Sequence, residues 1–203
     1  MKALFKAIAL FLAGALALLI AGTLLLLHGG ISAKSEPTHL EASLAGKLRK
    51  WAIPRSSRDL RNPVSPSDEV VAEGRAHFAD HCAICHANDG GGRTEMGENL
   101  YPRTPDLRQP DTQQLSDGEL FYIIENGVRL TGMPGFGNGS EEGQRASWKL
   151  VAFIRHLPKL TAKEKLEMQR LNPKSPEEWR ELQEDEEFLE GSKTQEPPQS
   201  HHH

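Results

Sequence analysis

The longest apolar run of the chain stands at its beginning. It extends from Ala7 to Leu27 without a charged residue, and Lys2 and Lys6 precede it. A helix needs about 20 apolar residues to cross the hydrocarbon core of a bilayer, whereas the apolar part of a signal peptide usually has about 7–15. No clean small-residue cleavage site follows the run. Residues 1–30 are therefore predicted to form an uncleaved, single-pass membrane anchor, with a long cleaved signal peptide as the alternative.

Three further segments have apolar residues at helical spacing, and each starts at residues typical of a helix N-terminus. The first begins at Ser65–Asp68, where a serine can cap the helix and acids favour its positive end. The second begins at the capping box Ser116–Glu119 and stops at Asn126–Gly127. The third begins near Ser140, and Pro158 ends it. This pattern predicts an all-α fold.

Long loops rich in glycine and proline separate these helices. One runs from Asn88 to Pro110, and another contains Thr131–Gly137. Loops of this length are unusual in so small a domain, and they are suited to wrap a large apolar cofactor. The compact domain is predicted to cover residues 65–159.

The regions on either side of this domain are more polar. Residues 31–64 mix Gly, Ser, Pro and basic side chains, which predicts a linker with a short helix near His39–Trp51 and a reach of about 35 Å. Capping boxes at Thr161–Glu164 and Ser175–Glu178 predict two helices in an acidic extension over residues 160–203. The extension ends in a polar tail with three histidines, which are either the remnant of an expression tag or a weak binder of a transition metal.

Composition limits both the core and the partners. Hydrophobic residues make up 37% of the 203 residues, and many of them lie in the predicted anchor. A small core usually needs a disulfide, metal or cofactor to hold it together. The net charge is −4, with basic residues in excess before residue 66 and acidic residues in excess after it. No basic face is interleaved with aromatic residues, so nucleic acid is not expected as a partner.

The two cysteines of the chain lie in the stretch Cys82-Ala83-Ile84-Cys85-His86, a C-x-x-C-H motif typical of c-type haem attachment. Each thiol can form a thioether with one haem vinyl group, and the imidazole that follows can bind the iron. In a final helical turn the three side chains converge on one face of the macrocycle. The motif therefore predicts one covalent haem c, held by Cys82, Cys85 and His86.

Two other uses of such a cysteine pair fit less well. A zinc site needs four nitrogen or sulfur ligands, and only His77 and His81 lie near the cysteines in the sequence. A thioredoxin-like redox pair needs a βαβ context, and the pattern of apolar residues does not provide one. The predicted export signal and a methionine in a downstream Gly/Pro loop both favour haem.

With these features the chain resembles the class I c-type cytochromes over residues 67–158. The residues that carry the resemblance are Gly74, Phe78, Cys82–His86, Pro105–Leu107, Gly132–Pro134, Leu150, Phe153 and Ile154. The resemblance implies a class I cytochrome c fold, in which the first and last helices cross around one haem. Gly74 would allow the close approach, and Phe78 would pack against Leu150 and Phe153. The Pro105 carbonyl would accept a hydrogen bond from the ring of the haem-binding histidine.

Met133 is the predicted second axial ligand of the iron. Met1 is the first residue, Met168 lies past the domain on a polar helix, and Met96 follows the glycine run closely and is expected to pack or to face solvent. Met133 sits in a Gly/Pro loop that can bring its thioether over the other face of the haem. A His/Met pair raises the reduction potential relative to His/His, which suits a carrier. The alternatives on paper are three histidines. His81 adjoins the thioether cysteine Cys82 and cannot easily reach either axial position, and His77 and His156 are expected at the surface.

The haem propionates need cationic or hydrogen-bonding partners, a role that suits the guanidinium group. Arg103, Arg108 and Arg129 are candidates, and Tyr101 and Trp148 could also donate. Each of these residues is equally an ordinary surface or packing residue.

These features predict a membrane-tethered monohaem electron carrier rather than an enzyme, because no nucleophile elbow, phosphate loop or metal-binding helix occurs. Since c-type haem is attached outside the cytoplasm, the haem domain is expected on the periplasmic side of the cell membrane, linking a respiratory donor to an acceptor. Two alternatives stay open. One is a haem-bearing subunit of a larger oxidase or dehydrogenase complex. The other is a sensor or peroxidase-like protein whose sixth iron position is open or displaceable.

Overall fold

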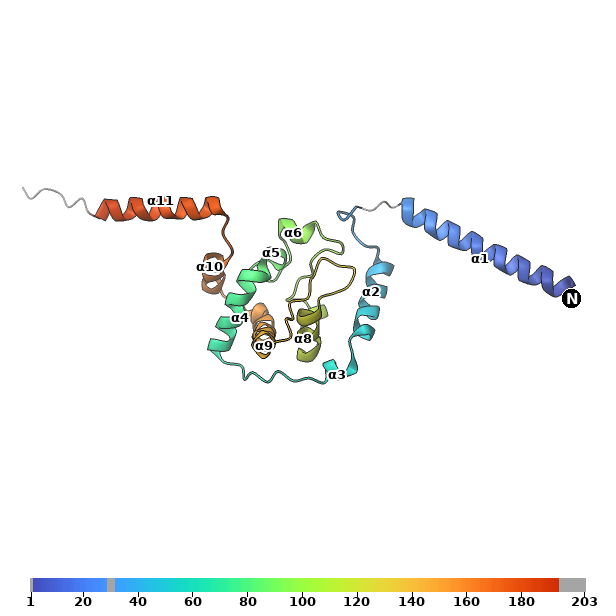
Figure 1. Cartoon of the computed structure of the whole chain (residues 1–203), viewed down its shortest axis with the longest axis horizontal. Helices are drawn as coiled ribbons and strands as arrows, with labels where there is room; N and C mark the ends of the chain where they lie inside the picture. The colour runs from blue at the N-terminus through green and yellow to red at the C-terminus, as the bar shows by residue number, and fades with distance from the viewer. Residues whose placement is uncertain (1, 29–31, 194–203) are drawn as a thin grey trace, which may run out of the picture.

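The structure is a computed structural model that describes residues 2–28 and 32–193 (Figure 1). Within this part of the chain every regular element is a helix, which confirms the all-α prediction. The elements are α1 (Lys2–His28), α2 (His39–Ala52), α3 (Arg55–Arg58), α4 (Asp68–His81), α5 (Ala83–His86), α6 (Glu95–Glu98), α7 (Pro110–Gln113), α8 (Asp117–Asn126), α9 (Glu141–His156), the 3-10 helix η1 (Leu157–Lys159), α10 (Ala162–Leu171) and α11 (Pro176–Lys193). The predicted polar tail with its three histidines, and residues 1 and 29–31, lie outside the described residues.

The helices of the domain begin at the polar residues that the sequence marks as caps. Ser67, Ser116 and Ser140 each accept a hydrogen bond from the backbone N–H three residues on, at 3.0–3.2 Å. Glu119 completes the capping box of α8, because its carboxylate accepts from the Ser116 N–H at 2.8 Å. Gly127 ends the same helix with a φ of 67°, a conformation that favours glycine. Local polar residues therefore set where these three helices start, and Gly127 sets where α8 stops.

The first and last helices of the domain, α4 and α9, cross in close contact at Gly74. A Cβ atom added there would collide with the carbonyl oxygen of Lys149 and would lie 3.0 Å from the Cβ of Phe153. The rings of Phe78 and Phe153 have their centroids 5.2 Å apart, and Leu150 is buried in the same cluster. This crossing is the arrangement that the resemblance to class I c-type cytochromes implies.

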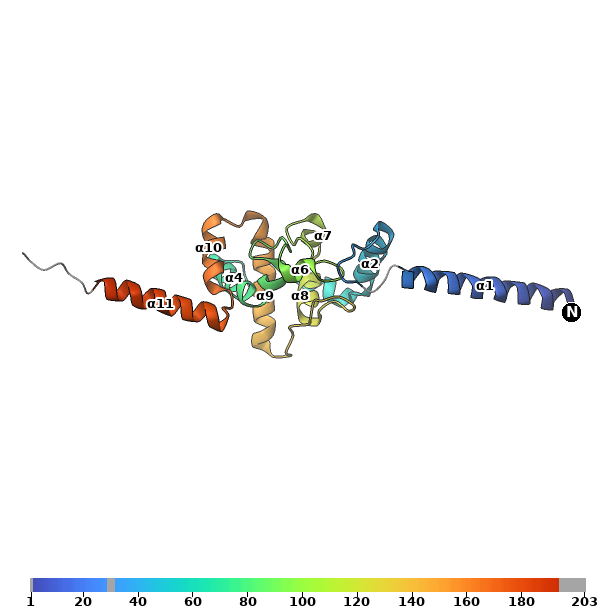
Figure 2. The same cartoon turned by 90° about the horizontal axis from the view of Figure 1, so that it is seen from above.

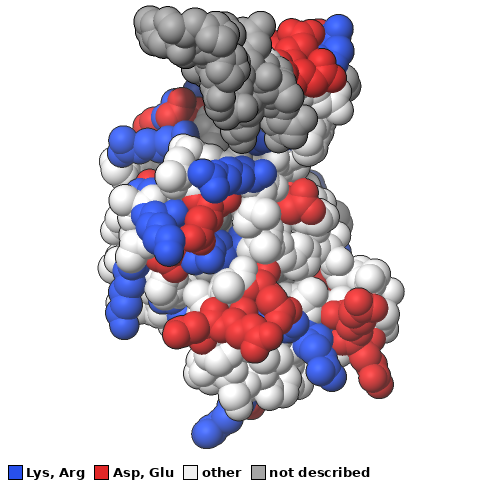
Figure 3. Space-filling view, turned by 90° about the vertical axis from the view of Figure 1, so that its left-hand side faces the viewer, with Lys and Arg blue, Asp and Glu red and all other residues white. Residues whose placement is uncertain are grey.

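The core continues past the predicted domain into α10. The sequence places Met168 beyond the domain on a polar helix, yet the structure buries it completely. Polar contacts clamp α10 to α4: Arg75 pairs with Glu164 at 2.9 Å and with Glu167 at 2.8 Å. The Asn172 amide also donates to a carbonyl of α4 at 2.8 Å. On the face that includes α4 and α10, acidic and basic side chains accordingly lie side by side (Figure 3).

Residues 31–64 are predicted as a linker. The described part of this segment, residues 32–64, contains α2 and α3 and lies along the domain (Figure 1). Ile53 at the end of α2 is only 3% exposed. The hydroxyl of Ser116 donates to the Arg58 carbonyl at 2.9 Å, and the hydroxyl of Tyr101 donates to the carboxylate of Glu41. These contacts fix much of the segment to the domain, so only part of it can act as a flexible tether.

Helix α1 extends away from the domain, and α11 does so at the other end of the described chain (Figures 1 and 2). Residues Lys2–Leu25 form a helix long and apolar enough to cross a membrane, and none of it is buried within the protein. Large apolar side chains such as Phe11 and Leu18 are about three-quarters exposed, at 75% and 76%. This exposure is consistent with single-pass membrane anchoring, because a bilayer would cover side chains that water disfavours.

The variant Gly74→Ala tests the helix crossing. The new methyl group meets the Lys149 carbonyl, so α4 and α9 must separate, and overpacking of this kind costs about 1–3 kcal/mol. We expect the urea midpoint of the full chain in detergent to fall accordingly. Gly46→Ala in α2 is the matched control, because a Cβ there meets nothing within 4 Å, and its midpoint should stay equal or rise. Equal midpoints for the two variants would contradict the close approach.

Candidate haem site

An apolar cavity opens between the crossed helices, α8 and the two long loops. Its empty space, including the open mouth, is about 1140 Å³. The apolar walls include Phe78, Leu100, Leu107, Leu115, Leu120, Ile123, Ile124, Leu150 and Ile154. A concave, mostly apolar space with few polar groups is typical of a cofactor site. Four predicted site residues line this one cavity: Cys82, Cys85, His86 and Met133.

The C-x-x-C-H stretch forms a helical turn directly after α4. The Cys82 carbonyl accepts hydrogen bonds from the N–H groups of Cys85, at 3.2 Å, and of His86, at 2.9 Å. This single turn, continued as α5, brings two thiols and one imidazole to the cavity, as the spacing of the motif predicts. The residues present therefore fit a haem attached at this end of the cavity.

Burial favours the neutral forms of these three groups. It raises the pKa of the Cys82 thiol to about 12 and also raises the pKa of Cys85. Burial lowers the pKa of His86 to about 4, and the backbone of Pro105 opposes part of this shift. His86 is 9% exposed, and its buried Nδ1 has no hydrogen-bond partner of ordinary geometry. The neutral imidazole is the form that binds a metal ion.

The first long loop, residues 88–107, is fixed to α5 by hydrogen bonds. The N–H of Gly92 donates to the His86 carbonyl at 2.9 Å, and the hydroxyl of Thr94 donates to another carbonyl of α5 at 2.7 Å. Further along, the N–H of Leu107 donates to the Gly90 carbonyl at 2.8 Å. These bonds hold the loop beside the imidazole, so that its proline turn forms part of the cavity wall.

Arg108 holds the end of this loop through two carboxylates. Its Nε and Nη2 donate to Asp106, both at 2.8 Å, and its Nη1 donates to Asp89 at 3.0 Å. The hydrogen bonds from Arg108 keep the pKa of Asp106 well below its usual range. Arg108, a predicted partner of the propionates, is therefore already engaged by the loop. Arg129, a second predicted partner, is exposed and does not line the cavity.

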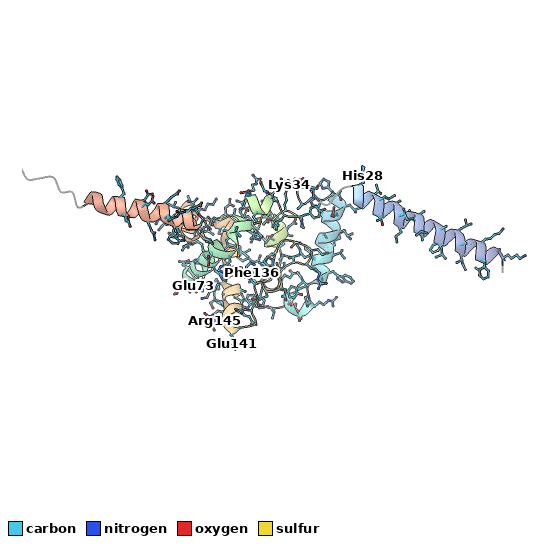
Figure 4. The ribbon with its side chains drawn as sticks, turned by 45° about the horizontal axis from the view of Figure 1, so that its top comes forward. His28, Lys34, Glu73, Phe136, Glu141 and Arg145 are labelled. Atoms are coloured by element: carbon cyan, nitrogen blue, oxygen red, sulfur yellow. The ribbon has the colours of Figure 1, made fainter. Side chains whose placement is uncertain are left out.

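Met133 reaches the cavity from the loop between α8 and α9. Its N–H donates to the Thr131 hydroxyl at 3.2 Å, and its carbonyl accepts from the Val128 N–H at 3.1 Å. The N–H of Phe136 donates to the Ile124 carbonyl at 2.9 Å, which ties the loop back to α8. Phe136 lies toward the centre of the molecule (Figure 4) and also lines the cavity.

The other two methionines of the described chain lie elsewhere. Met96 on α6 is 49% exposed, and Met168 is fully buried in the core behind α4. Neither of them lines the cavity. Of the described methionines, Met133 alone lies where a cofactor in this cavity would meet it.

The predicted histidine alternatives have partners of their own. His81 lines the cavity, but its ring pairs with Asp80 at 3.1 Å, and the His77 ring packs edge-on against it with centroids 4.9 Å apart. His156 hydrogen-bonds Glu164 at 2.9 Å. Within residues 2–28 and 32–193, no group of three or more His, Cys, Asp or Glu side chains could hold a metal ion.

Among the remaining candidates for the propionates, Arg103 lines the cavity and pairs with Glu36 at 2.9 Å. Trp148 is buried, and its ring stacks on that of Phe121 with centroids 4.1 Å apart, so it acts in packing. Tyr101 faces α2, where its hydroxyl bonds a carboxylate.

Arg49 is a cavity residue that sequence reasoning missed. It extends from α2 to the cavity wall, and its Nε is buried without a hydrogen-bond partner. A buried, unpaired guanidinium nitrogen is costly unless a ligand satisfies it. The only signal in the sequence is the helical spacing of α2, which puts Arg49 on the side opposite its leucines.

The crossed helices, the cysteine-histidine turn and the apolar cavity together define a c-type cytochrome domain. Residues 69–154 also match the model of the family described as cytochrome c oxidase, cbb3-type, subunit III. No curated protein matches the chain. The matched segment runs from the first turn of α4 to the last turns of α9 and includes the C-x-x-C-H motif. A domain of this class binds haem c and serves in haem-based electron transfer, which indicates an electron carrier rather than an enzyme.

The variant Asp106→Asn tests the ion pair through which Arg108 holds the end of the first long loop. Because the folded state lowers the pKa of Asp106, its charge stabilises the fold above its ordinary pKa of 3.8, and this contribution is lost as the pH falls below that value. At pH 7 we expect the variant to be less stable than the wild type by about 1 kcal/mol. Urea midpoints measured from pH 7 downward should converge below about pH 4.

The control for Asp106→Asn is Asp111→Asn, which removes a nearby exposed carboxylate at the start of α7. Its midpoint should follow that of the wild type at every pH. A difference between wild type and Asp106→Asn that stays constant with pH would contradict the role of the charge.

Proposed function

We propose that the domain carries one haem c, attached by thioethers to Cys82 and Cys85 and bound at the iron by His86 and Met133. The observation that carries this proposal is the convergence of these four side chains on one apolar cavity. No further cysteine exists in the chain, so one covalent attachment site is the most that the thiols can provide.

The bound haem would supply a reversible one-electron change at its iron. The chain's own residues then have limited tasks. His86 offers a neutral imidazole held by the turn of α5, and the thioether of Met133 favours the reduced state relative to a second imidazole. The walls formed by Leu120, Ile124 and Leu150 exclude water. These tasks are binding, orientation and exclusion of solvent, which are the tasks of a carrier.

The double variant Cys82→Ser/Cys85→Ser tests the covalent attachment. Without the two thiols no thioether can form, so the denatured chain should have the mass of the polypeptide alone and should fail to stain for haem after denaturing electrophoresis. Each single variant retains one thiol and should keep less haem than the wild type. Ile84→Ala is the control, because this residue lies between the two cysteines but is 62% exposed; it should retain all the haem. Haem that stays bound to the denatured double variant would refute the proposal.

The variant Met133→Ala tests the second axial ligand. We expect it to keep its covalent haem, to lose the absorption that arises from charge transfer between sulfur and ferric iron, and to have a lower midpoint potential. The decrease should be on the order of 100 mV, a modest part of the ~0.8 V that axial ligands span. A redox titration with optical spectra measures both properties.

Met96→Ala is the matched control for this ligand, because Met96 is half exposed and lies outside the cavity. It should keep the wild-type potential. An unchanged potential in Met133→Ala, or a wild type without the charge-transfer absorption, would instead favour a protein with an open sixth position, such as a sensor.

We further infer that α1 spans the membrane and that the domain faces the periplasm, where it passes electrons between membrane-associated redox partners. The exposed apolar surface of α1 supports the first part. The second part follows from the proposed thioethers, because c-type haem is attached outside the cytoplasm.

A second candidate function is that of a haem-bearing subunit in a larger oxidase complex. The description of the matched family, a subunit of a cbb3-type oxidase, favours it. The two candidates differ in the size of the particle purified in mild detergent: a free carrier elutes as the chain alone, and a subunit elutes with its complex.

A further inference from the structure

Helix α2 has an apolar stripe that the rest of the described chain leaves uncovered. Leu40, Leu44, Leu48 and Trp51 follow one another at spacings of four, four and three residues, which places them on one side of the helix. All four side chains are more than half exposed, and Trp51 is 84% exposed. We call these four residues the α2 stripe.

The opposite side of α2 is attached to the domain. Arg49 extends from that side to the cavity wall, and Ile53, just after the helix, is buried. At the start of the helix, Glu41 accepts the hydrogen bond of Tyr101. Because α2 stands at the edge of the domain (Figure 1), these contacts turn the α2 stripe outward.

Basic side chains flank the α2 stripe. Lys47, Lys50 and Arg55 are exposed, and within the part of the chain that the structure describes they pair with no carboxylate. Residues 32–61 contain seven Lys and Arg against three Asp and Glu, although the chain as a whole has a net charge of −4. The surface around α2 is therefore the basic part of an acidic protein.

Helix α2 also lies close to the candidate membrane span. α1 ends at His28 and α2 begins at His39, and a chain of this length spans at most about 40 Å when fully extended. Lys34 lies between the two helices in the sequence, on the domain side of His28 (Figure 4). If α1 crosses the bilayer, α2 therefore has to stay near the surface of that bilayer.

We propose that α2 is a membrane-surface helix: the α2 stripe inserts among the head groups of an anionic bilayer, and the flanking cations contact lipid phosphates. An amphipathic helix with Leu and Trp on one side and Lys and Arg beside them is suited to this position, and Trp favours the interface. This inference rests on the proposed anchoring by α1. It extends that anchoring, because a second contact fixes how the domain, and the cavity edge at Arg49, face the membrane.

Helix α11 differs from α2 in the charge that surrounds its exposed apolar side chains. It also exposes large apolar side chains, Trp179 and Phe188. However, eight acidic residues accompany them in α11, against two basic ones. An anionic surface would repel such a helix, so α11 supplies a control of matched exposure and opposite charge.

Hydrogen exchange of the full haem-loaded chain, one copy per nanodisc, tests the proposal. Two kinds of nanodisc are compared: one with roughly one third anionic lipid and one with zwitterionic lipid only. We expect the backbone amides of α2 to exchange about tenfold more slowly in the anionic nanodiscs, because each cation near an anionic surface adds to binding. Leu48→Ser/Trp51→Ser should abolish this difference, and Lys47→Gln/Lys50→Gln should reduce it. Trp179→Ser should leave the exchange of α2 unchanged.

The replaced side chains are exposed, so each variant should still fold. The optical spectrum of the haem in each variant checks this. Equal exchange of α2 in both kinds of nanodisc would overturn the proposal, as would protection that the Leu48→Ser/Trp51→Ser variant retains. Protection that depends on the number of copies per nanodisc, and not on lipid charge, would also overturn it in favour of contact between copies. A chain that elutes apart from the nanodiscs would refute the α1 anchor as well, so the two failures are distinguishable.

Discussion

The close crossing of α4 and α9 at Gly74 is the constraint on which the rest of the domain depends. It brings the backbones together where any side chain at Gly74 would strike the Lys149 carbonyl. Because the cysteine turn follows α4 directly, the position of both thiols is inherited from this crossing. Leu150 and Ile154 on α9 then face the same cavity. The absence of a side chain at Gly74 thus permits the crossing that places the cysteine turn and α9 beside the same cavity.

The same burial that makes the cavity apolar also sets the chemical state of its polar groups. It raises the pKa of the two thiols and lowers the pKa of the His86 imidazole, which favours the neutral form of each. A ligand that binds only the folded state stabilises that state by an amount that grows with the logarithm of its affinity. The haem proposed for this cavity would stabilise the fold in this way.

Much of the fold could be predicted because its signals are local. Capping residues such as Ser116 and Thr161 act within one helical turn, and the structure has helices starting directly after both of them. The C-x-x-C-H motif is a run of five residues, so its convergence on one cavity follows from helical geometry alone. The place of Met133 at the same cavity depends on a loop, and its role as a ligand stays a prediction.

The features that the sequence did not reveal are set by long-range contacts. Met168 is buried because Arg75 and Asn172 hold the mostly polar helix α10 against α4. The spacing of apolar residues in α10 does not predict this contact. Arg49 reaches the cavity only because α2 packs against the domain. The resemblance to known cytochromes does not help with either residue, because both lie outside the matched segment, residues 69–154.

Helices α2 and α10, which lie on either side of that segment, complete the domain. α2 contributes to the wall of the cavity, and α10 closes the core behind α4. A chain cut to residues 69–154 would therefore lose part of its cavity wall together with Met168, which is fully buried behind α4, so the smallest piece that keeps this domain whole is longer than the matched segment.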